Sequence, residues 1–261
     1  MSFVHDDRDF PQLLTLVTEE TRIAPALVEK DYWVTHCMWA LHQTGLDLWF
    51  KGGTSLSKGY GIIERFSEDL DLLMVQHGSA FGLPPVANWT STNKGPVAAR
   101  RAFHEALLSA FVIPGVKVEV DQKPQDKYAR SINLVGRYPG VLLDQLTEAM
   151  SPYVFFEIGR ARVVPFVERP LTSFVHDFLE RRGQLEDYTD NRPRAVRCVH
   201  PLVTLLEKPS ADEPALVLSD AERRAAVDRA LARISTMFWG PRVPVDEACA
   251  TIREWIRGNL S

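Results

Sequence analysis

The spacing of apolar residues predicts four helices in the first 110 residues. The clearest lies over 25–43, where apolar side chains recur every three or four positions, as on one face of an amphipathic helix. That face comprises Leu27, Trp33, Val34, Cys37, Met38 and Leu41. The other helices are expected over 9–18, 54–63 and 96–110.

Alternating and apolar runs predict strands between and after these helices. Residues 68–75 (EDLDLLMV) alternate and then become wholly apolar, which is typical of a strand in a sheet covered on one face. A short strand is predicted over 48–50, just before two glycines. The remaining strand candidates are 116–121, 129–135, 153–158 and 161–168.

The order of these elements favours an α+β fold. Helices are too few for a strict alternation with strands, so we expect a mixed or antiparallel sheet flanked by helices. A long loop is expected over 76–95, and helices are expected from residue 171 onward. The polar stretch 183–195 is the predicted boundary between a core with its N-terminal helices, 1–182, and a C-terminal helical lobe, 183–261.

The composition is that of an ordinary globular protein, with 45% apolar residues, 25% charged residues and a net charge of −4. The three cysteines form no CxxC pair, so neither a disulfide framework nor a cysteine zinc site is predicted. The histidines show no HxH or HExxH spacing, which argues against hydrolytic zinc chemistry. No apolar run reaches the roughly 20 residues of a membrane span, and we expect a cytoplasmic protein.

Residues 51–74 (KGGTSLSKGYGIIERFSEDLDLLM) are the strongest candidate for chemistry, and two carboxylates lie in their second half. In a strand, Asp69 and Asp71 point to one face and Leu70 to the other. Same-face neighbours lie about 7 Å apart, so both carboxylates can reach one or two divalent cations, which would also relieve their mutual repulsion. This spacing predicts a site for Mg²⁺ or Mn²⁺.

The first half of the same stretch carries two glycines between a predicted strand and a predicted helix. Gly52 and Gly53 allow the backbone to approach a ligand closely, and the start of the helix presents unpaired N–H groups. Further hydroxyls and positive charges nearby are those of Thr54, Ser55, Lys51 and Lys58. Together the two halves predict a nucleoside triphosphate held between backbone donors and metal-binding aspartates, as phosphoryl or nucleotidyl transfer requires. The spacing of a Walker A loop is absent.

Together with VEKDYWVTH at 28–36, this stretch resembles the AbiEii/AbiGii nucleotidyltransferase toxin family. That family includes the MenT toxins and belongs to the DNA polymerase β-like nucleotidyltransferase superfamily. The resemblance implies a polymerase β-like core and the metal-dependent toxin of a bacterial toxin–antitoxin or phage-defence system. It also implies transfer from an NTP to an acceptor hydroxyl, in some members the 3′ end of tRNA, and a cognate antitoxin as a partner.

The resemblance implies roles for single residues as well. It assigns the phosphate-binding turn to Gly52, Gly53 and Thr54 and the metal-binding pair to Asp69 and Asp71. Lys208, in the similar segment LLEK at 205–208, matches a basic residue that faces the nucleotide. A solvated helix pair of Glu207 and Lys208 is the alternative.

Polymerase β-like folds usually bring a third carboxylate to the metal pair from a neighbouring strand, and Glu157 is our first candidate. It shares a predicted strand face with Tyr153 and Phe155, where a carboxylate calls for a ligand or a place at the sheet edge. Glu119 and Asp121 are the competing candidates. Solvation at an edge strand would explain all three.

Several basic residues could meet the phosphates of a substrate. Arg65 precedes the acidic strand and is a candidate phosphate ligand, although a surface salt bridge to a neighbouring glutamate explains it as well. Lys94, Arg100 and Arg101 could guide an RNA acceptor, although a solvated helix face is the simpler explanation.

Two other functions stay open. After Lys208 we do not find the acidic motif that family members carry in their helical region. The chain could therefore be a non-catalytic protein of the same fold that binds an NTP or a partner. A small-molecule nucleotidyltransferase of the antibiotic-modifying type is the third possibility.

Overall fold

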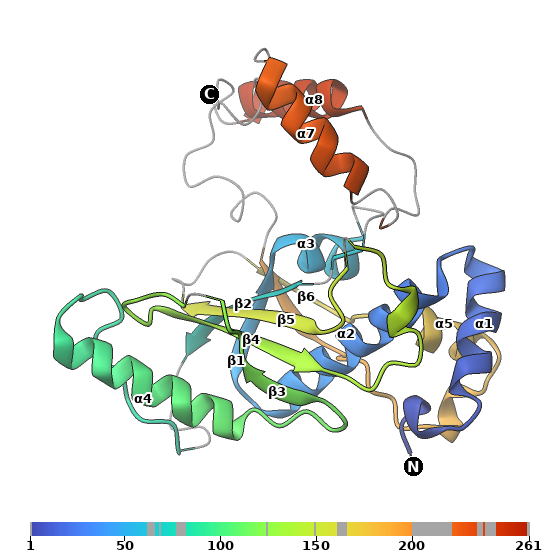
Figure 1. Ribbon diagram of the computed structural model, residues 1–261, viewed down its shortest axis with the longest axis horizontal. Helices are drawn as coiled ribbons and strands as arrows, with labels where there is room; N and C mark the ends of the chain where they lie inside the picture. The colour runs from blue at the N-terminus through green and yellow to red at the C-terminus, as the bar shows by residue number, and fades with distance from the viewer. Residues whose placement is uncertain are drawn as a thin grey trace.

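The computed structural model describes most of the chain and shows one mixed sheet with helices on its sides (Figure 1). The described residues are 2–61, 66–67, 69–76, 82–123, 125–148, 150–160, 166–199, 221–233, 237 and 244–259. The sheet has seven strands in the order β3-β4-β5-β2-β1-β7-β6. The expected α+β class with a mixed sheet flanked by helices is confirmed.

The strands run in both directions. In chain order they are β1 (Asp47–Lys51), β2 (Asp69–Gln76), β3 (Lys117–Val120), β4 (Ser131–Arg137), β5 (Val154–Arg160), β6 (Phe166–Arg169) and β7 (Val196–Val199). β2 is antiparallel to β1 and parallel to β5, while β1 is parallel to β7. The strand that carries both predicted aspartates therefore lies in the middle of the sheet, with a neighbour on each side.

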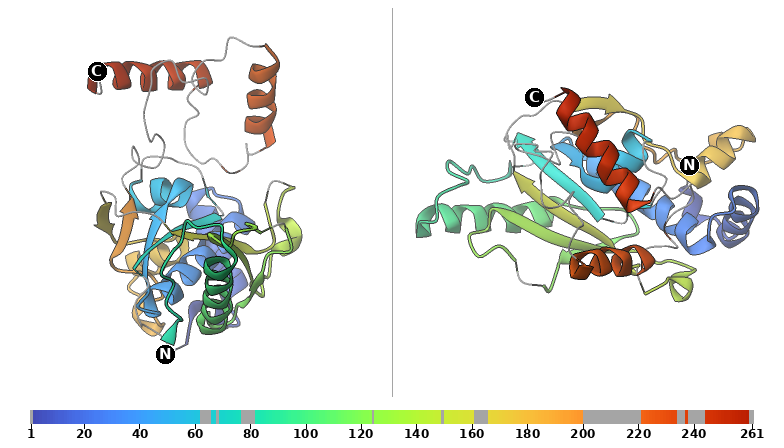
Figure 2. Two further views of the ribbon diagram at one scale, coloured as in Figure 1. Left: turned by 90° about the vertical axis from the view of Figure 1, so that its left-hand side faces the viewer. Right: turned by 90° about the horizontal axis from the view of Figure 1, so that it is seen from above.

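The helices largely follow the predicted ranges. They are α1 (Phe10–Thr21), α2 (Pro25–Gln43), α3 (Gly52–Thr54), α4 (Lys94–Ala110), α5 (Phe174–Arg181), α7 (Ala221–Arg233) and α8 (Val245–Asn259). α3 begins two residues before the predicted start and continues as a π-helical turn over Ser55–Gly59. Figures 1 and 2 show α7 and α8 beyond α3, apart from the sheet. Within the described parts of the chain, we find no helix with the length and apolar character of a membrane span.

One element contradicts the prediction of helices after residue 171. β7 is a strand that pairs with β1 on one side and β6 on the other. Its residues Val196, Cys198 and Val199 are buried. The sheet-containing core therefore extends past the boundary predicted at 183, and the division into a core and a C-terminal lobe stays a prediction with that change.

The two faces of the sheet differ in polarity. On one face Leu70, Leu72, Phe156 and Ile158 are buried in a continuous core that also contains residues of α2 and α4. The opposite face carries the alternate residues of the same strands, which are more polar and only partly buried. A sheet packed on one face only is expected to show this alternation, and the polar face is the one on which the predicted aspartates lie.

α2 is buried on almost all sides, since it lies between the sheet and the helices α1 and α5 (Figure 1). A helix in that position is normally apolar all round, yet three consecutive charges occur in it, Glu29, Lys30 and Asp31. Glu29 accepts hydrogen bonds from the backbone N–H groups of Val141 and Leu142, at 2.7 and 2.8 Å. Each of the three charges binds a different part of the chain.

Lys30 and Asp31 bind the segments that lead into the polar face. The Lys30 ammonium donates to the carbonyl oxygens of Ser151 and Tyr153, directly before β5. Asp31 accepts from the Lys58 ammonium at 2.5 Å, and Lys58 belongs to the π-helical turn that follows α3. The buried charges of α2 therefore fix β5 and the glycine turn relative to each other.

We expect an Asp31→Ala variant to lower the free energy of unfolding by about 3–5 kcal/mol, because it leaves the buried Lys58 ammonium without its carboxylate. Urea unfolding followed by circular dichroism would measure the change. Glu119→Ala, which breaks the exposed ion pair with Arg137, is the matched control and should leave stability almost unchanged. Equal effects of the two substitutions would contradict the structural role of the buried pair.

The buried His104 predicts a dependence of stability on pH. Burial lowers its pKa to about 4, and the nearby Arg100 adds to the decrease. The unfolded chain therefore binds a proton between pH 6.5 and 4 that the folded protein does not, and stability is lost as the pH falls through this range. In a His104→Phe variant the free energy of unfolding should fall less steeply as the pH decreases. The two slopes should differ by up to about one bound proton, which is roughly 1.4 kcal/mol per pH unit.

Urea unfolding of both proteins at several pH values between 7 and 4 would test this expectation. The difference between the two slopes isolates His104, because the raised pKa values of the buried Glu29 and Asp31 act in the opposite sense in both proteins. Identical slopes would show that His104 is not buried in its neutral form.

Candidate active site

The glycine turn packs directly against the acidic strand. β1 ends at Lys51, and Gly52 turns the chain into α3 with a φ of 66°, in the left-handed region that favours glycine. A Cβ atom placed on Gly52 would lie 1.9 Å from Oδ2 of Asp71. The sequence predicts that the backbone at this glycine approaches a ligand closely. In the structure it also packs closely on Asp71, one of the two predicted metal ligands.

A row of polar side chains crosses the sheet at the same place. In the strand register Lys51 of β1 lies opposite Asp71 of β2, and Asp71 lies opposite Glu157 of β5. The Lys51 Nζ atom is 3.7 Å from Asp71 Oδ1 and 3.8 Å from Glu157 Oε1. Asp69 is two positions before Asp71 in β2 and belongs to the same face. The structure thus brings all three predicted carboxylates onto one face.

These side chains are accessible to a ligand. The exposed fractions of the Lys51 and Asp71 side chains are 25% and 28%, and that of Glu157 is 46%. The charges are therefore partly shielded from water without being sealed into the core. Such a partly open face can admit a charged substrate and still strengthen its electrostatic contacts.

The register also distinguishes Glu157 from its competitors. Glu119 and Asp121 belong to β3 and its end, and two strands separate β3 from β2. Three inter-strand spacings amount to roughly 14 Å, too far for a shared ion. Glu119 is instead paired with Lys117 and Arg137. Of the three candidates, only Glu157 is adjacent to Asp71.

The hydroxyls of the turn point into the protein. Thr54 is buried, and its Oγ1 donates a hydrogen bond to the carbonyl oxygen of Asp69 at 2.7 Å, so it ties α3 to the acidic strand. Ser55 is also buried, beside the Cys198 thiol, whose pKa is raised by burial. A phosphate at this turn would meet backbone N–H groups first, and direct contacts of the two hydroxyls with a phosphate stay predictions.

Two basic residues that were candidates to contact phosphate or RNA bind other parts of the protein instead. Lys58 is bound to Asp31, Thr35 and the carbonyl oxygen of Thr172, so it is not a charge beside the turn for a phosphate. Arg100 is fully buried and donates to three backbone carbonyls of neighbouring loops. Both explanations offered for Arg100, a guide for an RNA acceptor and a solvated helix face, are therefore wrong, because the sequence shows the charge of this helix residue but not that its side chain points into the protein.

Some predicted residues lie outside the part of the chain that the structure describes. These are Arg65, its neighbours Glu64 and Glu68, and the whole segment around Lys208. Their proposed contacts with a nucleotide therefore stay predictions.

The donor set of the polar face suits a divalent cation. Carboxylate oxygens are the ligands that Mg²⁺ and Mn²⁺ prefer, and Asp69, Asp71 and Glu157 supply them from two neighbouring strands. Because Gly52 has no side chain, the Asp71 carboxylate can pack directly against the turn. Across the described residues, no three His, Cys, Asp or Glu side chains already surround a common metal position. The carboxylates would have to close around an ion.

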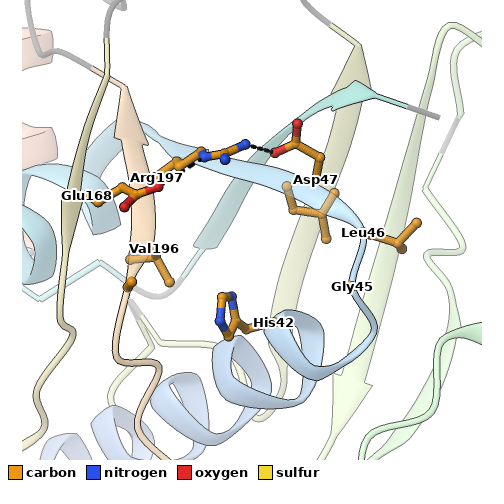
Figure 3. A pocket seen from close by; sticks show the side chains of 9 residues that line it. His42, Gly45, Leu46, Asp47, Glu168, Val196 and Arg197 are labelled. Carbon is orange, nitrogen blue, oxygen red and sulfur yellow. Dashed lines mark hydrogen bonds and ion pairs between the residues drawn. The ribbon is translucent and has the colours of Figure 1, made fainter. Parts of the chain in front are cut away.

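A pocket elsewhere on the sheet has side chains that are less suited to catalysis. A pocket of about 480 Å³ lies near the start of β1, at the opposite end of that strand from Lys51 (Figure 3). Its Arg197 binds Asp47 at 2.5 Å and Glu168 at 3.3 Å, so these three side chains are engaged with one another, and they lie at the far end of β1 from the glycine turn. The polar face at Asp71 is the better candidate for an active site.

Comparisons with known proteins give one matching family and a similar solved structure. The model of a family described as nucleotidyl transferase AbiEii toxin, Type IV TA system, matches residues 37–211, which include the glycine turn and all three carboxylates. No curated protein matches the chain. Among solved structures, the chain is similar to the nucleotidyltransferase toxin MenT4 of Mycobacterium tuberculosis H37Rv, with 21% identity and a TM-score of 0.41. That match covers 72% of this chain and 54% of MenT4, so the chain spans about half the length of that toxin.

Proposed function

Because the chain belongs to the AbiEii family of nucleotidyltransferase toxins, we propose that it transfers a nucleotide from an NTP to an acceptor hydroxyl on the polar face of its sheet. The observation that carries the proposal is the convergence of Lys51, Asp71 and Glu157 directly beneath the turn at Gly52. The packing of a glycine turn on a carboxylate that also meets an ammonium distinguishes this cluster from the ion pairs of Arg197 elsewhere in the sheet.

The proposed roles follow from this geometry. Asp69, Asp71 and Glu157 would hold Mg²⁺ or Mn²⁺, which when bound neutralises phosphate charge and orients the leaving pyrophosphate. The backbone N–H groups at Gly52 and Gly53, at the start of α3, would bind the triphosphate. Thr54 keeps the turn in contact with the acidic strand through its bond to Asp69.

Residues that the structure does not describe complete the proposal. Lys208 would add positive charge around the triphosphate, as the resemblance to the family implies, and Arg65, which precedes the acidic strand, would add a second charge. The 3′ end of tRNA is the proposed acceptor and an antitoxin the proposed partner, both supported by the family alone. With NTP and tRNA as reactants, the cytoplasm is the proposed compartment.

Incubation of the purified protein with labelled NTPs, Mg²⁺ and total tRNA tests the proposal. Label should appear in RNA, and the Asp69→Ala/Asp71→Ala protein should give none. Binding of NTP without any labelled product would favour the non-catalytic alternative. Label on an aminoglycoside but not on RNA would favour the antibiotic-modifying alternative.

A further inference from the structure

The ammonium of Lys51 lies close to two carboxylates of the polar face. Its Nζ atom is within 3.8 Å of one oxygen of Asp71 and one oxygen of Glu157, and the side chain is only 25% exposed. Neighbouring carboxylates on adjacent strands repel each other. An ammonium between them compensates that repulsion.

This position is determined by the fold. Lys51 is the last residue of β1, directly opposite Asp71, and it precedes the turn at Gly52. The backbone at both ends of the pair is held, by the ladder between β1 and β2 and by the close packing of Gly52 on Asp71. The long Lys51 side chain above them can change its place without moving a strand.

We infer that Lys51 is an internal counter-cation that competes with the divalent cation for Asp71 and Glu157. The inference rests on the proposed function, which places the divalent cation at these carboxylates. Because an ammonium and a divalent cation repel each other at close range, binding of the metal requires Lys51 to leave the two carboxylates. The flexible four-carbon stem of a lysine allows this movement.

After this movement the Lys51 ammonium could bind the triphosphate. The glycine turn follows it directly in the sequence, so an ammonium displaced from Asp71 lies beside the proposed triphosphate site. A triphosphate would therefore stabilise the displaced position of Lys51, and by linkage it would favour metal binding at the carboxylates. Lys51 thus couples the two ligands of the site in addition to any contact that it makes with phosphate.

Binding of Mn²⁺ to the nucleotide-free protein, measured by the loss of the free-ion signal in electron paramagnetic resonance, tests the inference. A Lys51→Met variant removes the charge and keeps a side chain of similar length, so it should bind Mn²⁺ roughly tenfold more tightly than the wild type. Lys51→Arg keeps the charge and should bind like the wild type. Lys117→Met, which removes an exposed charge from β3, should also leave the affinity unchanged.

The outcomes separate this inference from the proposed function. If Mn²⁺ binding is abolished by Asp71→Asn but is not strengthened by Lys51→Met, the metal site stands and the competition is refuted. If no Mn²⁺ binding depends on Asp71, both the metal site and the inference are wrong. Melting curves of each variant show that a change in affinity is not a loss of folded protein.

Discussion

Replacement of Asp71 by asparagine is expected to lower the rate of nucleotide transfer by about 10³-fold. Asp71 is the carboxylate that contacts Lys51, neighbours Glu157 and lies under Gly52. Asparagine has nearly the same shape but no negative charge, so the variant keeps the strand and loses the hard anionic ligand. Initial rates of label incorporation from NTP into RNA measure the effect, and thermal melting should show a folded protein.

Glu119→Gln is the matched control for this substitution. Glu119 is on the same face of the sheet, but it is separated from Asp71 by two strands and is paired with Arg137. Its neutralisation should leave the rate unchanged. A protein that transfers nucleotides at the wild-type rate without the Asp71 carboxylate would refute the assignment of the active site.

The sequence predicts the local half of this site and not the other half. That Asp69 and Asp71 share a face follows from the alternation of side chains in any strand, and β2 realises it. That Glu157 lies beside Asp71 follows from the pairing of β2 with β5, two strands about 86 positions apart in the chain. The alternation made Glu157 a candidate, but only the register separated it from Glu119.

The burial and pairing of charged residues are the features that are hardest to predict from the sequence. Asp31 and Lys58 are 27 positions apart and Lys58 contacts Thr172 even farther along the chain, so nothing local shows that they are paired. A lysine close to two glycines is equally typical of a phosphate ligand. The short strand β7 was missed for a similar reason, because four residues become a strand only between the two neighbours that cover their edges.

A Gly52→Ala variant is expected to transfer nucleotides at least about 100-fold more slowly and to lose more than the roughly 1–2 kcal/mol of stability that backbone strain alone costs. Two causes combine. The residue has a φ of 66°, which disfavours any side chain, and its Cβ would overlap Oδ2 of Asp71 at 1.9 Å. To relieve the overlap, either the turn or the carboxylate must move, and both movements separate the triphosphate site from the metal site.

Gly61→Ala separates the two causes. Gly61 has a φ of 62°, and no atom of the described residues lies within 4 Å of the position its Cβ would take, so it shares the backbone strain of Gly52 without the overlap. Its variant should lose only the stability that the backbone strain costs, about 1–2 kcal/mol, and should keep the transfer rate. In Gly52→Ala/Asp71→Ala the overlapping carboxylate is gone, so stability should return to that of Gly61→Ala while transfer stays abolished. If Gly52→Ala and Gly61→Ala have equal rates, the contact between the turn and Asp71 does not matter for the reaction, and the glycine serves only the path of the backbone.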